Sequence, residues 1–399
     1  MPSIVTKLQT LKVRQLQKLA LSIGILSSGA KKDLINRLTE TFQTYDRHGR
    51  GQSDLTARHE SAKAKLQEQR NPALMSILSI DMGIRNLAYA HILVSSRFET
   101  DTSLEGTTQP ISQPLSTAKI SLNAWDRLAI SSFPSHEIQR DPSAMPISKL
   151  GGLGKVVSQS SSYLQEGEEQ TERDPKEHFA PYLYASHAYT LITSLLEAYK
   201  PTHILIERQR FRSGGSSAVL EWTIRVGVFE GMLYAVLHTL RQQGKGGLAR
   251  PFVQGVDPQR VVRYWTNDEK KEDIAADSKK RVSSKEGKKA KIDLVGRCLS
   301  RSVGVDLDIA SKAEIPLELG LIDGSQARDI VQAYLNKWNG GSRTSKKGAV
   351  RVSTEQNNER IENIGKLDDL ADSLLQGITW LEWQKMTEKL LYSNAAIPI

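Results

Sequence analysis

Apolar positions along this chain form two kinds of run, short ones typical of buried strands and long ones with helical spacing. The clearest short runs lie within 76–94. One ends at Asp81, a polar turn containing Gly83 follows, and a second runs from Leu87 to Val94. This pattern predicts a β-hairpin with Asp81 at the end of its first strand. Because a carboxylate at the end of a buried strand is costly without a charged partner, Asp81 is a candidate functional residue.

Strand-like and helix-like runs alternate along the rest of the core. A strand ending in a carboxylate recurs at Glu207, whereas 302–325 shows no clear period and is interpreted as a connection. The expected elements are a strand at 119–129, a helix at 178–199, a strand at 202–207, a helix at 217–240, a strand at 251–256 and a helix at 367–391.

The last of these helices carries a third group of acids. At about 100° per residue its apolar side chains form one arc, with Asp368 and Asp372 beside the arc and Asp369 farther toward solvent. Each acid alone has an ordinary explanation, such as a turn residue, an arginine partner or a helix N-terminal charge. Carboxylates at three separated sites are, however, the ligands that a hard divalent cation needs. Their joint occurrence therefore indicates a metal site.

Composition favours a soluble protein with a polyanionic partner. The chain has 399 residues, a formal net charge of +9 and 25% charged residues. No apolar run reaches the ~18 residues of a membrane span, so none is expected. The positive excess points first to nucleic acid, although a merely basic protein is the alternative. A single cysteine, Cys298, excludes a disulfide within the chain and suits a reducing compartment.

Residues 1–41 form a separate pattern of two short amphipathic helices around a glycine-bounded turn, with Lys31 and Lys32 at the start of the second helix. The pattern resembles a SAP motif, a small DNA-binding module whose basic residues contact phosphates. An ordinary helical hairpin is the alternative. The first acid is Asp33, and such an acid-poor start also suits an organelle transit peptide. Residues 42–72 are polar and are expected to be a linker or a solvated helix.

The order of the core elements resembles the ribonuclease H-like fold. More closely, Ile80-Asp-Met-Gly-Ile-Arg-Asn-Leu-Ala, Ile206-Glu-Arg-Gln and Asp368-Asp-Leu-Ala-Asp-Ser-Leu-Leu resemble motifs of the fungal mitochondrial Holliday-junction resolvases, relatives of the RuvC type. The resemblance implies an α/β fold, with a mixed five-stranded sheet flanked by helices. It implies a resolvase domain at 73–399, with added segments near 133–177 and 268–291.

This resemblance also implies an activity. The expected protein is a mitochondrial homodimer that cuts four-way (Holliday) DNA junctions in recombination, using two Mg²⁺ per active site, with Mn²⁺ able to substitute. The catalytic acids and metal ligands would be Asp81, Glu207 and the helix acids. The RuvC-type three-residue spacing favours Asp369 with Asp372, whereas the helical wheel favours Asp368 with Asp372. We prefer Asp368 at this stage and keep both.

Contacts with DNA are expected from basic and aromatic residues near the acids and in the basic segments. The loop after Glu207 should lie near the scissile strand, where Phe211 is expected to stack on an unpaired base. A dimer interface is expected on the helix at 217–240, through Phe229 and Leu233. The predicted DNA-binding residues are Lys31, Lys32, Arg85, Arg208, Gln209, Arg210, Phe211, Arg212, Lys288, Lys289 and Lys291.

Two other functions remain open from the residues alone. A sugar-kinase or actin-like ATPase also begins with a strand, Asp-x-Gly and a hairpin, but it needs a second glycine-rich phosphate loop. The nearest candidate, Leu321-Ile-Asp-Gly-Ser, follows no clear strand pattern. A non-catalytic DNA-binding protein built on the SAP motif is the other alternative, and intact acids at all three sites argue against it.

Overall fold

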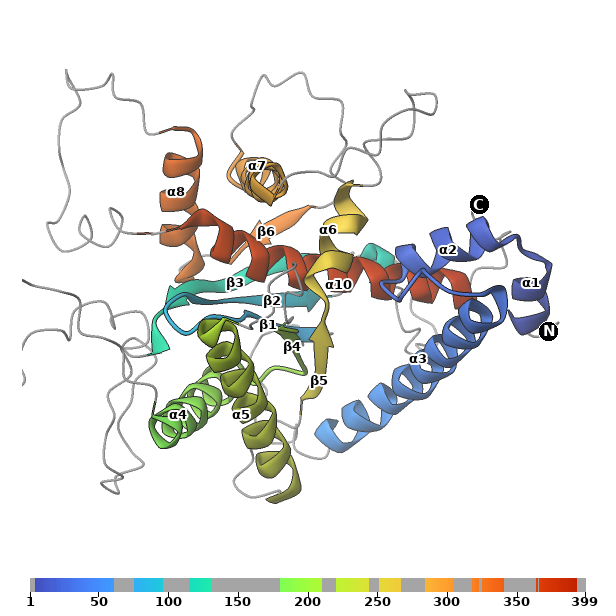
Figure 1. Ribbon diagram of the computed structural model, residues 1–399, viewed down its shortest axis with the longest axis horizontal. Helices are drawn as coiled ribbons and strands as arrows, with labels where there is room; N and C mark the ends of the chain where they lie inside the picture. Colours follow the sequence, from blue (N-terminus) through green and yellow to red (C-terminus); the bar gives the residue numbers. More distant parts are fainter. Residues whose placement is uncertain are drawn as a thin grey trace, which may run out of the picture.

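At the centre of the computed structural model is a six-stranded mixed sheet with the order β5-β4-β1-β2-β3-β6 (Figure 1). Strands β1 to β3 are antiparallel neighbours, and β4, β5 and β6 join the sheet in parallel. The strands are β1 (Met75–Asp81), β2 (Leu87–Ser95), β3 (Lys119–Leu128), β4 (His203–Glu207), β5 (Phe252–Val256) and β6 (Leu319–Leu321). The structure describes residues 4–60, 75–95, 115–130, 180–209, 220–243, 251–266, 284–304, 318–322, 325–340, 364 and 366–392.

Helices cover both faces of the sheet (Figure 1). One face packs against α4 (Pro181–Tyr199) and α5 (Glu221–Gln243). The other packs against α6 (Pro258–Thr266), α7 (Ser284–Ser302), α8 (Ala327–Trp338) and α10 (Leu367–Tyr392), and a short 3-10 helix, η2 (Leu115–Thr117), precedes β3. Among the described helices, none combines the length and apolarity needed to cross a bilayer.

This architecture confirms the predicted α/β class and the ribonuclease H-like mixed sheet flanked by helices, but five strands was the wrong count. The sixth, β6, pairs in parallel with β3, with Leu319 opposite Ile120 and Leu321 opposite Leu122. It lies in the segment that the sequence pattern assigned to a connection. Three residues are too few for an alternating pattern to show, so the strand exists because β3 offers it a free edge.

Alternation along the strands decides which face the acids reach. Ile77 on β1 packs into the core under α10, whereas Leu78 and Ile80 pack into the core under α4 and α5. Successive side chains of a strand point to opposite faces, so Asp81 continues the row of Ile77 and faces α10. On β4 the same alternation places Glu207 on that face. The two strand-end acids therefore meet the helix that carries the other three.

The predicted interface residues on α5 are wrong. Phe229 and Leu233 are both 0% exposed and belong to the core between the sheet and α4. Part of the expectation for this helix is correct, because it also exposes apolar side chains. Its opposite side exposes Ile224 and Val228 at 45% and 37%.

A separate small core holds the N-terminal helices α1 (Ile4–Thr10), α2 (Val13–Ser22) and α3 (Lys31–Glu60). There are three helices where two were expected, and α3 continues through part of the expected linker at 42–72. This N-terminal module packs on the last turns of α10 through Met386, Leu390 and Leu391. The SAP identity of the module stays a prediction.

Contact between the module and α10 is close at Gly24. A Cβ at Gly24 would lie 2.1 Å from the ring of Trp383, and the backbone there has a φ of +72°. Both features favour glycine. Arg260 on α6 donates from Nη1 to the Gly24 carbonyl oxygen at 3.1 Å. The module is thus fixed to the core by packing and by a hydrogen bond.

Candidate active site

Asp81 and Glu207 are neighbours at the carboxyl ends of adjacent parallel strands. The register pairs Ile80 with Ile206, so the next residues along β1 and β4 are the two acids. Adjacent strands lie about 4.8 Å apart. The Asp81 side chain is 8% exposed and hydrogen-bonds to that of Glu207. Burial, followed by this contact, raises the pKa of Asp81 well above its usual range. Burial therefore disfavours the charged form of Asp81 unless a cation lies beside it.

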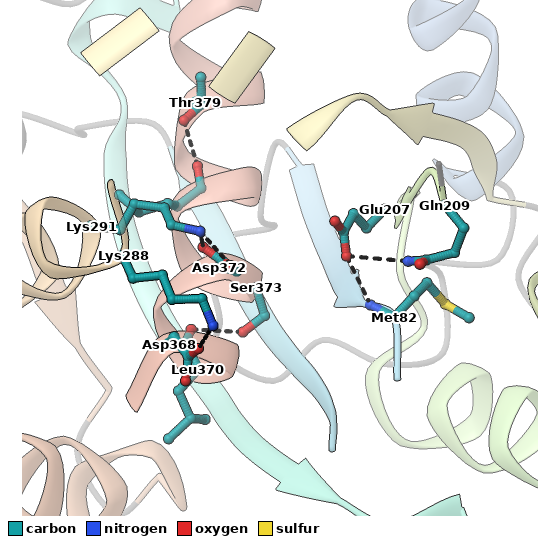
Figure 2. A network of polar contacts seen from close by, with 11 residues as sticks. Met82, Glu207, Gln209, Lys288, Lys291, Asp368, Leu370, Asp372, Ser373 and Thr379 are labelled. Atoms are coloured by element: carbon teal, nitrogen blue, oxygen red, sulfur yellow. Dashed lines mark hydrogen bonds and ion pairs between the residues drawn. The ribbon is translucent and has the colours of Figure 1, made fainter. Parts of the chain in front are cut away.

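Two N–H groups hold Glu207 in place (Figure 2). The Met82 backbone N–H donates to Glu207 Oε2 at 3.3 Å, and Gln209 Nε2 donates to the same oxygen at 3.5 Å. Both donors lie directly after the strand ends. One backbone N–H and one side-chain N–H thereby orient one carboxylate oxygen of Glu207.

Acids of α10 lie in its first two turns, where the helix dipole favours negative charge. Burial raises the pKa of Asp372 to about 6, with Lys291 acting in the opposite direction and Glu207 adding to the rise. Lys291 donates to Asp372, and Lys288 donates to Asp368 at 2.7 Å, both from α7 (Figure 2). Two lysines thus neutralise one edge of the acidic turn.

Asp369 faces a different neighbour from Asp368. Arg127 on β3 donates from Nη1 to Asp369 Oδ2 at 3.4 Å and to Asn86 Oδ1 at 3.2 Å. The α10 carboxylates whose charge raises the pKa of Asp81 are Asp372 and Asp369, whereas Asp368 pairs with α7. The partner of Asp372 stays a prediction, and the effect of the Asp369 charge on Asp81 is an argument for Asp369 against our preference for Asp368 from the helical wheel.

The first turns of α10 are held against the sheet from two sides. The indole Nε1 of Trp125 on β3 donates to the Leu370 carbonyl oxygen at 3.0 Å and to Ser373 Oγ at 3.3 Å. At Gly377 a Cβ would lie 2.7 Å from Ile92 Cδ1 and 3.2 Å from Ser79 Cβ, so a larger residue would require these side chains to shift. These contacts bring the acidic turn to the strand ends.

The donor set fits a hard divalent cation. Asp81, Glu207, Asp369 and Asp372 offer only carboxylate oxygens, which Mg²⁺ prefers, and burial raises the pKa values of Asp81 and Asp372. In the described part of the chain, no three His, Cys, Asp or Glu side chains already stand close enough to hold a metal.

Comparison with known proteins agrees with this geometry. The family model described as "Mitochondrial resolvase Ydc2 / RNA splicing MRS1" matches residues 77–390. The chain belongs to this family. The match begins in β1 and ends in α10, so it includes the three elements that carry the candidate catalytic acids, β1, β4 and α10.

Two curated relatives of the Ydc2/MRS1 family member are both named "Cruciform cutting endonuclease 1, mitochondrial". The Schizosaccharomyces pombe protein is 28% identical over 209 residues, 52% of this chain and 60% of the relative. The Saccharomyces cerevisiae protein is 28% identical over 196 residues, 48% of this chain and 50% of the relative. The chain thus spans between half and 60% of the length of these relatives.

A solved structure, that of the yeast mitochondrial Holliday junction resolvase Ydc2, aligns with 96% of this chain and 98% of its own. Its sequence identity is 20% and its TM-score is 0.46.

In this Ydc2/MRS1 family member, the predicted DNA-binding lysines of α7 divide into two groups. Lys288 and Lys291 pair with α10 acids, whereas Lys289 between them is exposed. In the N-terminal module, Lys31 and Lys32 are exposed, and Lys31 Nζ donates to the Gln9 carbonyl oxygen at 2.8 Å. Contact of these residues with DNA stays a prediction.

The basic residues predicted near the acids are partly described. Arg85 lies over the ring of Trp222 at 5.5 Å. Arg208 packs over Gly255, and the Gln209 backbone N–H donates to Glu230 Oε2 at 3.0 Å. These contacts hold the start of the loop after β4 against β5 and α5. The other predicted members of this loop, Arg210, Phe211 and Arg212, lie outside the described residues, as do 133–177 and 268–283.

Three residues of the site escaped the sequence analysis. Arg127 donates to Asp369 and also to Asn86, and Gln376 lies buried one turn after Asp372. Arg127 gave no signal, because a charged residue at a strand end is common. Gln376 did give one, since it is a polar residue within an otherwise apolar stretch of helix.

Proposed function

We propose that this protein is a metal-dependent endonuclease that resolves four-way DNA junctions in mitochondria. The observation that carries the proposal is that Asp81, Glu207, Asp369 and Asp372 lie close together, where the carboxyl ends of β1 and β4 approach the start of α10. Membership of a family described by a mitochondrial resolvase supports it, as do two relatives named mitochondrial cruciform cutting endonucleases. The substrate would be the branched DNA that such names describe.

Phosphodiester hydrolysis needs a water in line with the leaving 3′ oxygen. Divalent metal, when bound, would activate that water and stabilise the leaving oxygen. Asp81, Asp369 and Asp372 would hold Mg²⁺, or Mn²⁺ in its place, and two ions per site are proposed. Glu207, oriented by Met82 and Gln209, would add a ligand oxygen or accept a proton. No side-chain nucleophile is required.

The family description also covers an RNA splicing protein, so membership alone does not establish cleavage. Burying several carboxylates together is costly, as the raised pKa values of Asp81 and Asp372 show. A protein that only binds nucleic acid does not need a buried cluster of carboxylates, whereas a protein that binds a catalytic metal does. The ATPase alternative gains no support either, because its nearest phosphate-loop candidate begins in β6, which β2 and β3 separate from β1.

A homodimer is part of the proposal, because two opposed cuts need two active sites. We place its interface on the outer side of α5, where Ile224 and Val228 expose apolar side chains. Gly227 and Gly231 lie on the same helix with no atom within 4 Å of where a Cβ would stand, so a partner helix could approach closely. The occupant would be a second copy of this chain.

The N-terminal module would add DNA affinity. Residues 1–45 contain seven lysines and arginines against two acids. Lys12, Arg14 and Lys18 on α2 are exposed, like the lysines at the start of α3. Phosphates would be the partners of this surface, and its contribution would fall steeply with salt.

Nicking of a fixed four-way junction, compared with linear duplex, tests the proposal. Purified protein should cut the junction only when Mg²⁺ or Mn²⁺ is present, and at paired sites on opposite strands. Asp81→Asn should bind the junction in a metal-free buffer and not cut it. Cleavage that persists in a chelator, or that treats both DNAs alike, would contradict the proposal.

A further inference from the structure

Gln376 is a buried amide within the apolar surface of α10. Its side chain is 3% exposed, and its neighbours Leu374, Leu375 and Ile378 are all buried. Burying an amide is expensive unless hydrogen bonds replace those it made with water. A leucine would fill this position without that cost. What the amide contacts should therefore explain its presence.

The amide bridges α10 to both acid-bearing strands. Gln376 Nε2 donates to Ser79 Oγ at 3.0 Å, to the Ile80 carbonyl oxygen at 3.1 Å and to the Leu205 carbonyl oxygen at 3.3 Å. Carbonyl oxygens only accept, so it must be the amide nitrogen that faces them. Its two hydrogens are shared among three acceptors from β1 and β4.

The groups that Gln376 joins lie close to the proposed catalytic acids along each backbone segment. Ile80 precedes Asp81, the second carbonyl belongs to the strand that ends at Glu207, and Gln376 lies four residues after Asp372 on the same side of the helix. One side chain thus connects the three backbone segments that carry acids. Few other single groups in the described structure could set the spacing of all three.

We propose that Gln376 is a positioning residue that fixes the distance between the α10 acids and the strand acids, and so sets the affinity of the site for divalent metal. The inference rests on the proposed function, because it concerns the same metal site. Metal ligands must be held to within about 0.5 Å of their working geometry. Loss of an outer-shell contact typically weakens metal binding about 10–100-fold.

The test uses the full chain and Mn²⁺ as the probe, measured by titration calorimetry without DNA. Gln376→Met keeps an unbranched side chain of similar length and removes the donor. We expect its Kd for Mn²⁺ to rise about tenfold or more, and the Mg²⁺ concentration for half-maximal cleavage to rise with it. Junction binding in a chelator should match the parent.

A matched control separates positioning from stability. Thr387 is also buried on α10, and its hydroxyl donates to the Trp383 carbonyl oxygen at 2.7 Å, within the helix. Thr387→Val should lower the melting temperature and leave the Mn²⁺ affinity unchanged. An equal loss of Mn²⁺ affinity in this control would overturn the inference.

Ser79→Ala keeps the inference testable if Gln376→Met does not fold. It removes one of the three acceptors with little change in volume, and we expect a smaller loss of Mn²⁺ affinity in the same direction. Parental affinity in folded Gln376→Met, or in Ser79→Ala if the former misfolds, would overturn the inference alone. A parent protein that binds no Mn²⁺ would instead overturn the proposed function.

Discussion

Asp368 and Asp369 are adjacent in sequence, yet each faces a different neighbour. Asp368 pairs with Lys288, whereas Asp369 lies with Arg127 and acts on Asp81. We therefore expect Asp369→Asn to reduce the rate of junction cleavage at least 100-fold, about 3 kcal/mol, and Asp368→Asn to reduce it less than tenfold. Single-turnover cleavage across Mg²⁺ concentrations measures this.

As a control, both variants should bind the same amount of junction DNA in a metal-free buffer. The opposite order of effects would restore the preference for Asp368 that the helical wheel gave. Asp372→Asn should match Asp369→Asn, because Asp372 belongs to both possible pairs.

We predict that the Asp81 carboxylate lowers the stability of the folded protein, although cleavage requires it. Its folded-state pKa lies above its usual value, as does that of Asp372, at about 6. Such groups are neutral and cost nothing at low pH, and their penalty grows as pH rises from the unfolded-state pKa through the folded-state pKa. In a chelator near pH 7.5, Asp81→Asn should therefore melt higher than the parent, by roughly 2–4 °C per kcal/mol of relief.

Near pH 5 that difference in melting temperature should shrink. Added Mn²⁺ should stabilise the parent and have little effect on the variant. Scanning fluorimetry over pH, with and without metal, records both trends. A variant that melts lower than the parent at every pH would mean that Asp81 stabilises the fold.

At the scale of elements, α5 has two apolar sides with different roles. Ile224 and Val228 are exposed, whereas Phe229 is buried against α4. The double change Ile224→Glu with Val228→Glu should give a folded monomer in sedimentation and lose paired cutting. Phe229→Asp is the contrasting control, and burial of its charge should unfold the chain. A folded dimer from the double change would remove α5 from the interface.

Strands and helices with a clear hydrophobic period could be predicted from the sequence. Which elements pack beside one another in the fold could not. The hairpin, the strand ending at Glu207 and the final helix lie within a few residues of their predicted bounds. The helical wheel gave each acid an angle on its own helix. It could not show that α7 lies on one side of α10 and β3 on the other, and this decides the roles of Asp368 and Asp369. Likewise β6 depends on its partner strand, and the contacts of Gln376 join residues about 170 to 300 positions apart.

At the scale of the whole molecule, the N-terminal module has a small core of its own, which packs on the last turns of α10. Deleting it would uncover Trp383, Met386 and Leu390, so loss of function after deletion would have two causes. We expect Lys31→Gln with Lys32→Gln to raise the Kd for junction DNA and to reduce its log–log salt slope by about 1–2. Cleavage at saturating protein should persist.

Fluorescence anisotropy over a range of salt concentrations measures that slope. The matched variant is Gly24→Val, whose side chain would collide with Trp383 and should lower the melting temperature. An unchanged Kd in the double lysine variant would show that the module serves stability only.

One helix, α10, carries the metal-site acids in its first two turns and the docking residues of the module in its last turns. Its 26 residues span about 39 Å. One turn of B-form DNA is about 34–36 Å long. If the module binds DNA and the bound arm runs along α10, the cut phosphate and the phosphates at the module are therefore about one duplex turn apart, and they face the same side of a straight arm. An arm shorter than about ten base pairs would end before it reached the module.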